Sequence, residues 1–225
     1  MYSGGVCMPR RDPEQKTKVE IVKTAAQLFS ERGWNGVTIE DVVQELGVTS
    51  GAFYYYFKSR EELVYAVITQ SLTDDNPFAL ASKQTELNAI EKLRFALKRS
   101  LKSQLEVLNP SPTLANAMLK TMYDPIVFKS NALFSVNVFA LHIEKLLIEG
   151  NADGSLSAQY PKHAAQAAAM LFNEWLNPSI FQMTSAEFAD RLSFLEQFGV
   201  CMGIPVLDEQ LKEMLLQLYE SCKQS

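Results

Sequence analysis

Apolar residues recur every three or four positions along almost all of the 225-residue chain, and this spacing constrains its fold more than any other feature. Only 10 glycines and 9 prolines interrupt the pattern. No segment keeps the alternation of apolar and polar residues that is typical of a β-strand. With 47% hydrophobic residues, the chain can build a core without disulfides or structural metal ions. The sequence therefore predicts an all-α protein.

The predicted helices change in length along the chain. Cap and turn signals predict an N-terminal set at 13–33, 38–47, 49–57 and from residue 59 onward. Longer amphipathic helices are expected at 84–108, 113–123, 125–150, 161–178, 185–199 and 208–223, with Asn, Asp, Gly and Pro at the breaks. We expect a flexible arm at 1–11, an N-terminal unit at 12–72 that includes the start of the fourth helix, and a larger helical unit at 73–225. Met1 and Met8 both remain candidate start residues.

Composition excludes several classes of protein. The three cysteines, Cys7, Cys201 and Cys222, lie far apart, which fits a reducing compartment and supports neither a disulfide framework nor a metal site. The chain has no run of 18 uncharged apolar residues and no signal-peptide pattern, so we expect a cytoplasmic protein without membrane contact. It also has no phosphate loop, nucleophile elbow or paired His and Glu motif. We therefore expect no enzyme activity, no cofactor and no metal.

The segment from Thr38 to Phe57 has the spacing of a helix-turn-helix. If Phe53 points inward, helical periodicity places Phe57 beside it and leaves small residues and tyrosines on the outer side. This outer face suits a DNA major groove, because small residues let the backbone approach base edges and phenol hydroxyls can donate to phosphates. The sequence therefore predicts that 12–72 is a DNA-binding domain.

Positive charge is expected at the ends of this segment. The helices that begin near Thr38 and Ser59 present unpaired amides, which favour anions, and Lys58 and Arg60 add full charges. The whole chain carries 21 basic against 26 acidic residues, a net charge of -5 that taken alone argues against nucleic acid as a partner. The position of the charges outweighs their total, and the acidic balance predicts weak nonspecific DNA binding.

The residues TIEDVVQELGVTSGAFYYYFKSREEL, together with the preceding TAAQLFSERGWNGVT, resemble the DNA-binding region of the tetracycline-repressor (TetR) family. The resemblance covers about 13–70 and implies that the DNA contacts are Thr38, Thr49, Ser50, Gly51, Ala52, Tyr54, Tyr55, Tyr56, Lys58 and Arg60. Tyr56 lies between the inner and outer faces and is equally compatible with a core role. Ser50 and Ala52 replace the longer polar residues common in the family, so DNA shape should contribute more than direct base contacts.

The C-terminal unit is rich in methionine and aromatic residues, which form core or line adaptable pockets. We expect a ligand pocket at Met118, Met122, Tyr123, Phe139, His142, Phe172, Asn173 and Trp175, although each is also compatible with ordinary core packing. The resemblance implies an inducer site here and a four-helix dimer interface from the last two long helices. The interface residues would be Ala165, Ala168, Ala169, Phe188, Leu192 and Leu195. The basic residues of the helix at 84–108, interspersed with Glu91 and Glu106, are interpreted as a solvated face: Lys92, Arg94, Lys98, Arg99 and Lys102.

These features predict a homodimeric transcriptional regulator, by family default a repressor. It would bind a pseudo-palindromic operator in double-stranded DNA and be released by a small, largely apolar effector. The alternative is a DNA-binding protein whose C-terminal domain, 73–225, docks a protein partner and has no inducer. A bounded cavity of roughly several hundred Å³ would favour the sensor, and a solid core would favour the alternative. The sequence does not identify the operator, the effector or the regulated genes.

Overall fold

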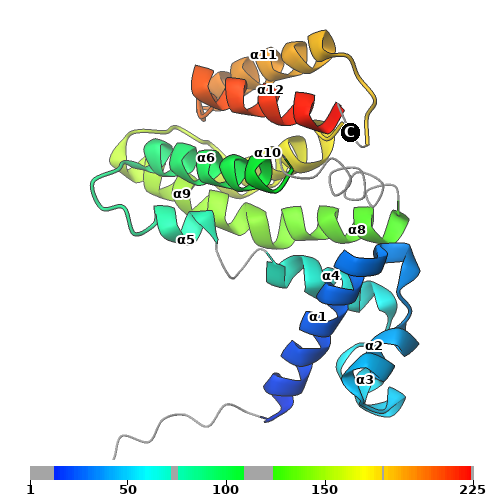
Figure 1. Ribbon diagram of the computed structural model, residues 1–225. Coiled ribbons are helices and arrows are strands. Elements are labelled where there is room, and N and C mark those ends of the chain that lie inside the picture. Colours follow the sequence, from blue (N-terminus) through cyan, green and yellow to red (C-terminus); the bar gives the residue numbers. More distant parts are fainter. Residues whose placement is uncertain (1–12, 72–75, 109–123, 179, 224–225) are drawn as a thin grey trace, which may run out of the picture. The chain divides into compact units, whose positions relative to one another are not determined.

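The computed structural model describes residues 13–71, 76–108, 124–178 and 180–223 (Figure 1). This part of the chain contains helices and no β-strand, which confirms the predicted all-α class. The chain divides into two compact units between Val67 and Ile68, a little before the expected boundary at 72. The expected arm at 1–11 and helix at 113–123 lie outside the described residues.

The N-terminal unit is built from α1 (Pro13–Arg32), α2 (Ile39–Leu46), α3 (Ser50–Tyr56) and the first part of α4 (Arg60–Ser71). Its core consists of apolar residues from all four helices: Ile21, Val22, Ala25, Leu28, Phe29, Val42, Phe53, Leu63 and Val64. As predicted, α1 ends at Gly33, which has a φ of 75° and donates its N–H to Phe29 O (2.9 Å). Trp34 then stacks on Phe29 with ring centroids 4.4 Å apart, which fixes the turn into α2.

The C-terminal unit is larger and is also entirely helical in its described part. Its elements are α5 (Pro77–Ala81), α6 (Ala89–Leu108), α8 (Pro125–Phe134), η2 (Ser135–Phe139), α9 (Ala140–Asp153), α10 (Pro161–Met170), η3 (Leu171–Trp175), α11 (Ser185–Cys201) and α12 (Glu209–Lys223). Helix α6 packs against α5, α9 and α12; α10 packs against α9, and α11 packs against α12 (Figure 1). The core of this unit lies between these helices.

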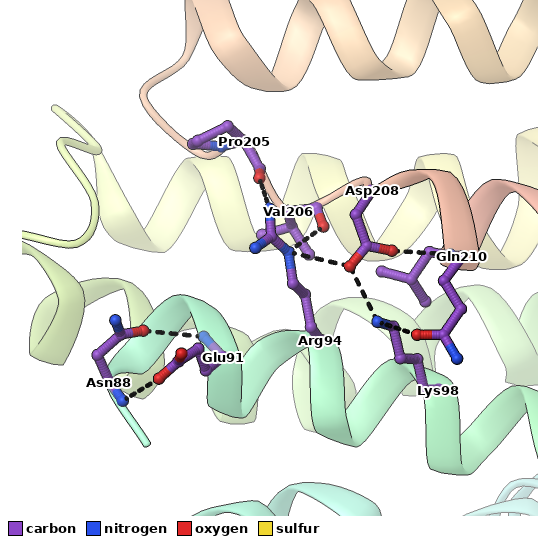
Figure 2. Close-up of polar contacts among 9 residues, drawn as sticks. Asn88, Glu91, Arg94, Lys98, Pro205, Val206, Asp208 and Gln210 are labelled. Atoms are coloured by element: carbon purple, nitrogen blue, oxygen red, sulfur yellow. Dashed lines mark hydrogen bonds and ion pairs between the residues drawn. The ribbon is translucent and has the colours of Figure 1, made fainter. Parts of the chain in front are cut away.

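The predicted helix at 84–108 begins later than expected, and a short helix precedes it. Asn76 caps α5 by accepting from Phe78 N (2.9 Å), and Pro77 occupies the first helical position. At the start of α6, Asn88 Oδ1 accepts from Glu91 N (3.0 Å), while Asn88 N donates to Glu91 Oε2 (2.9 Å; Figure 2). This reciprocal pair holds the helix start at Ala89, so the expectation of helix at 84–88 was wrong.

Two of the predicted long helices contain a π-helical turn. Ser135–Phe139 (η2) joins α8 to α9, and Leu171–Trp175 (η3) continues α10. Element η2 packs against α10, and η3 packs against α8, so both wide turns belong to one part of the core. A π turn inserts a residue into the helical repeat and often marks a functional site.

The continuous helix Pro125–Asp153 is long and apolar enough to cross a membrane by length and composition. A core helix of a globular protein satisfies the same test. Ala140, Ile143, Leu146 and Leu147 of this helix are buried in the core of the C-terminal unit. Packing within the unit accounts for part of its apolar character, since 33% of its most apolar stretch is buried.

Candidate nucleic-acid interface and ligand cavity

Helix α3 is defined at both ends by local contacts. Gly47 ends α2 with a φ of 69°, a left-handed conformation that favours glycine. Two residues later, Thr49 caps α3 by accepting from Ala52 N at Oγ1 (3.1 Å). Phe53 is 0% exposed and packs beside Phe57, with ring centroids 5.7 Å apart. These contacts anchor the inner face and so determine which side of α3 meets solvent.

The outer face of α3 presents small residues first and tyrosines one turn later. Ser50 and Gly51 are exposed, and Tyr54 and Tyr55 are 45% and 62% exposed. Ala52 and Tyr56 are half-buried, and the Tyr56 ring packs edge-on against Tyr55 (5.0 Å). The placement of these side chains is the one that groove binding requires, with an open backbone at one end and phenols beside it.

The N-terminus of α2 is partly occupied by the chain itself. Thr38 and Asp41 form a capping box: Asp41 N donates to Thr38 Oγ1 (3.2 Å), and Thr38 N donates to Asp41 Oδ2 (2.8 Å). Hydrogen bonds from the Thr38 hydroxyl and amide lower the pKa of Asp41, so its carboxylate stays ionised. Arg32 lies 3.5 Å from the same carboxylate. Thr38 is exposed, but the anion site predicted there already holds one negative charge.

Lys58 and Arg60 were predicted to hold phosphates, and the structure gives both of them contacts within the chain. Lys58 Nζ donates to Tyr54 O (2.9 Å), which caps the end of α3 while the side chain stays exposed. The guanidinium of Arg60 donates to the backbone oxygens of Trp34 and Val37 and lies over the Phe29 ring. Arg60 therefore stabilises the packing of α4 on α1, which corrects the expectation of a cation available for DNA.

The C-terminal unit encloses an apolar cavity of about 480 Å³. Its lining comes from α5, α6, α9, α10, η2, η3, α11 and the 202–207 segment. Of the lining side chains, only Tyr160 and His163 carry oxygen or nitrogen. Phe139 and Phe172, both predicted, line the cavity; Met118, Met122 and Tyr123 lie outside the described residues.

Three other predicted pocket residues are not among the lining residues. His142 hydrogen-bonds to Asn76 through Nε2 (2.9 Å), and burial lowers the pKa of this imidazole, helped by the charge of Lys145. Asn173 donates to Ser135 Oγ (2.9 Å). Trp175 packs against Phe194, and the Arg191 guanidinium lies 4.6 Å from its ring centroid. Each side chain has a partner elsewhere in the unit, which explains why it does not reach the cavity.

The segment 202–207, which was not predicted to contribute to a pocket, forms one wall of the cavity through Met202, Ile204, Val206 and Leu207. Figure 2 shows how α6 holds this wall: Arg94 donates to Val206 O (3.0 Å) and Pro205 O (2.9 Å), and Lys98 donates to Asp208 Oδ2 (2.9 Å). Arg94 and Lys98 are therefore not part of a solvated face, whereas Arg99 and Lys102 of the same set are exposed as expected. Arg94 and Lys98 give no sequence signal of their role, because their partners lie more than a hundred positions away.

Asp208, which accepts a hydrogen bond from Lys98, also caps the start of α12. Its Oδ1 accepts from Leu211 N (2.8 Å). Partial burial acts to raise the pKa of Asp208, but the hydrogen bonds from Lys98 and Leu211 outweigh it and lower the pKa. Lys92, another residue of the predicted solvated face, is buried and pairs with Glu149 at 2.5 Å. Lys92, Arg94 and Lys98 thus bind α9, the cavity wall and the start of α12.

The residues predicted for the dimer interface are covered by their own chain. Phe188, Leu192 and Leu195 are buried, as are Ala165 and Ala169, while Ala168 and Leu195 line the cavity. The expectation that Phe188, Leu192 and Leu195 need a partner to cover them was wrong, because these residues of α11 are buried in the core of their own unit, where α12 packs against α11. The apolar residues of α11 that face solvent are Phe194 and Val200, 53% and 61% exposed.

Within the described ranges, no group of three or more His, Cys, Asp and Glu side chains is arranged to hold a metal ion. Cys201 and Cys222 are both free thiols. The features with a recognisable arrangement are therefore the outer face of α3 and the apolar cavity.

Comparison with known proteins supports this interpretation of the N-terminal unit. Residues 21–67 match the family model described as "Bacterial regulatory proteins, tetR family". The probable HTH-type transcriptional regulator ArpR of Pseudomonas putida is 33% identical over 90 residues, 39% of this chain and 43% of ArpR. The HTH-type transcriptional repressor KstR2 of Mycolicibacterium smegmatis is 36% identical over 53 residues, 24% of this chain and 26% of KstR2. The matched segments thus span less than half of these relatives.

Solved structures extend the likeness in fold to most of the chain. A TetR-family transcriptional regulator from Pectobacterium atrosepticum is 19% identical, covers 86% of this chain and 98% of its own, and has a TM-score of 0.54. RolR in complex with resorcinol is 15% identical, covers 90% and 94%, and also has a TM-score of 0.54. The family model on the helix-turn-helix, the regulator relatives and the helical fold agree: residues 21–67 resemble the DNA-binding region of tetR-family regulators, and most of the chain shares the fold of one such regulator.

Proposed function

We propose that this protein is a transcriptional repressor that binds a pseudo-palindromic operator as a homodimer and is released by a small, largely apolar effector. The observation that carries the DNA-binding part is the outer face of α3, where Ser50 and Gly51 are open and two tyrosines stand one turn later. Two such helices would enter successive major grooves roughly 34 to 36 Å apart. KstR2, which resembles the N-terminal unit, is a repressor by name. The proposal includes a cytoplasmic location, no membrane contact and no catalytic activity.

The contacts that we assign to DNA are Thr38, Thr49, Ser50, Gly51, Ala52, Tyr54, Tyr55, Tyr56 and Lys58. Lys58 is exposed and can turn from Tyr54 O to a phosphate, whereas Arg60 acts indirectly by holding α4. Because Asp41 occupies the start of α2, phosphate binding there relies on the remaining amides of the first turn. Affinity should fall steeply with salt, as it does whenever phosphates contribute.

The direct test of the DNA contacts is the variant Tyr54→Phe plus Tyr55→Ala. Operator DNA is first selected from genomic fragments with the purified protein, and affinity is then measured by fluorescence anisotropy at two salt concentrations. We expect the double variant to fold normally and to lose at least about tenfold in affinity, since each phosphate or base contact contributes roughly 1 kcal/mol or more. Phe181→Ala removes an aromatic residue of the C-terminal unit that is 41% exposed, close to the 45% of Tyr54, and does not line the cavity, so it is the matched control. Unchanged operator affinity in the double variant would show that α3 is not the helix that contacts the bases.

The effector part of the proposal rests on the cavity. A space of about 480 Å³ with almost entirely apolar walls has the size and character of a small-molecule site. RolR, which shares the fold, was solved with resorcinol bound. The cavity also favours a sensor over a regulator whose C-terminal domain only docks a protein. The measurement is operator release: an apolar ligand that binds in the cavity should lower operator affinity, and Ala168→Trp should abolish ligand binding while operator binding persists.

The homodimer requires an interface other than the residues first predicted. We propose the solvent-facing side of α11, which carries Phe194 and Val200, because exposed apolar side chains of this size are commonly covered by a partner. Sedimentation velocity on Val200→Glu tests it, with Ile148→Glu on α9 as the control at similar exposure. We expect the Val200 variant to be monomeric and the control to stay dimeric. If Val200→Glu stayed dimeric and Ile148→Glu became monomeric, the interface would lie on α9 instead.

A further inference from the structure

Glu174 is a buried acidic side chain that forms no ion pair with any residue in the described part of the chain. It lies in η3 and is 5% exposed. Its Oε1 accepts from Ser135 Oγ (3.1 Å), and its Oε2 has no hydrogen-bond partner among the described residues. Buried acidic side chains are normally paired or fully hydrogen-bonded, so an orphaned oxygen in this position requires an explanation.

The neighbours of Glu174 form a directed chain of hydrogen bonds. Asn173 Nδ2 donates to Ser135 Oγ (2.9 Å), and the Ser135 hydroxyl in turn donates to Glu174 Oε1. Ser135 is itself buried. This chain orients the carboxyl group and leaves Oε2 as the open acceptor at its end. Burial raises the pKa of Glu174, and the hydrogen bond from Ser135 opposes that rise only in part.

The same two π turns supply both this polar cluster and one part of the cavity lining. Element η2 contributes Ser135 to the cluster and Phe139 to the cavity, and η3 contributes Asn173 and Glu174 to the cluster and Phe172 to the cavity. The members of the cluster therefore lie within four residues of an aromatic residue of the cavity lining, although none of them lines the cavity itself.

The chemistry of this region selects a class of ligand. The cavity has apolar and aromatic walls, with Phe78 edge-on to Phe139 (5.1 Å), and aromatic faces attract cations. A cation would compensate the buried carboxylate and engage Oε2, whereas an anionic ligand would add repulsion and a purely apolar one would leave Oε2 unpaired. One carboxylate, one hydroxyl and one amide are too few oxygen ligands for a dedicated metal site.

We infer that Glu174 is the acceptor for the cationic head group of an amphiphilic effector, an amine or amidinium whose apolar body occupies the cavity. The inference rests on the proposed effector response and names the class of effector. Ser135 and Asn173 are positioning residues, because they orient the carboxylate and need not touch the ligand. Glu174 does not itself line the cavity, so binding of the head group at Oε2 requires the wall between them to move.

Matched probes test the inference. The full chain is titrated by calorimetry at pH 7.5 with 4-phenylbutylammonium and with 4-phenylbutanol, which share an apolar body and differ in charge. We expect the ammonium probe to bind at least about tenfold more tightly than the alcohol, the usual gain from a hydrogen bond to a charged group. In Glu174→Gln this preference should vanish while the alcohol binds as before. Glu174→Asp, which keeps the charge on a shorter side chain, should retain part of the preference.

The outcomes separate the inference from the proposed function. Equal affinity for the two probes in the wild type, or an ammonium preference that survives in Glu174→Gln, would overturn the inference and leave the effector cavity intact. Binding of neither probe would overturn both. If the preference depends on Glu174 but neither probe weakens operator binding, the cation site stands and the effector response fails. Circular dichroism of Glu174→Gln confirms that a lost preference does not reflect unfolding.

Discussion

The bonds that define the helix-turn-helix and those that define the cavity wall differ in how far they reach along the chain. In the N-terminal unit, Thr38 bonds to Asp41 and Thr49 bonds to Ala52, pairs three residues apart. In the C-terminal unit, Arg94 holds Val206 and Lys98 holds Asp208, pairs separated by 112 and 110 positions. A helix-turn-helix whose helix ends are fixed by local bonds should keep its shape when its surface residues are substituted. A cavity closed by distant bonds depends on the arrangement of the whole unit.

The largest expected effect comes from truncating one buried side chain in the core of each unit. Phe53→Ala and Leu192→Ala each truncate a fully buried side chain, and we expect losses of about 3–5 and 2–5 kcal/mol in the free energy of unfolding. If the two units fold independently, Phe53→Ala should shift only the unfolding of the N-terminal unit, and Leu192→Ala only that of the C-terminal unit.

Urea denaturation followed by circular dichroism and by operator binding distinguishes the two transitions. The exposed Tyr55→Ala is the control and should change stability by less than about 0.5 kcal/mol. A single transition that both core variants shift together would mean that the division at Val67 is not a division in stability.

Two glycines with similar backbone conformations sharpen the comparison. Gly47 and Gly203 have φ values of 69° and 72°, so alanine at either position costs about 1–2 kcal/mol in backbone strain. A Cβ on Gly47 meets nothing within 4 Å, whereas one on Gly203 would lie 2.4 Å from Ser157 O. We therefore expect Gly203→Ala to be clearly the more destabilising in thermal melts and to weaken probe binding in the cavity. Equal melting temperatures for the two variants would contradict this account.

The buried acid predicts a pH dependence that belongs to the C-terminal unit. Because burial raises the pKa of Glu174 in the folded state, the folded protein binds the proton more tightly than the unfolded chain. Stability from this group should therefore fall as the pH rises above the ordinary glutamate value of 4.5 and through the raised pKa. Glu174→Gln should remove that decline and be more stable than the wild type at pH 7.5. If the melting temperatures of the two proteins changed in parallel between pH 4.5 and 7.5, Glu174 would not be the source of the pH dependence.

The smallest expected effect compares two equivalent helix caps. Thr38 and Thr184 each form a capping box, with Asp41 and Glu187, and alanine at either position should cost about 1 kcal/mol. Only Thr38→Ala should also lower operator affinity, because only that cap belongs to the proposed DNA surface. Chemical denaturation and anisotropy on both variants provide the measurement. Equal operator affinity in the two would remove Thr38 from the interface.

Local signals explain how much of this structure was predictable. Gly33, Thr38, Gly47 and Thr49 each fix a helix end through neighbours in sequence, and the structure confirms all four positions. Periodicity also identified Phe53 as the inward residue of α3. These signals were enough to orient the reading face, because a short helix with one buried anchor has a single outer side.

The remaining features depend on information that a helical pattern does not contain. Periodicity shows that Phe188 and Leu192 share a face, but not whether α12 or a second subunit covers it. A repeat of 3.6 residues also hides a π turn, so the contact between Ser135 and Glu174 could not be anticipated. Arg94 on an exposed-looking face gives no hint of carbonyl partners a hundred residues away. The sequence therefore predicted that the C-terminal unit contains an apolar cavity, but it identified only some of the residues that line it.

The segment GIPVLD, from Gly203 to Asp208, joins α11 to α12 and carries the Gly and Pro typical of a loop, the kind of segment that proteases usually cleave. In the structure its backbone is held at several points: Gly203 O accepts from Ser157 N, Ile204 N donates to Gly199 O, and Arg94 binds the next two carbonyls. Proteolysis requires a segment to detach and extend into the enzyme, which here means breaking contacts with three different parts of the unit at once. The segment 203–208 should thus be among the parts of the C-terminal unit that proteases cleave most slowly.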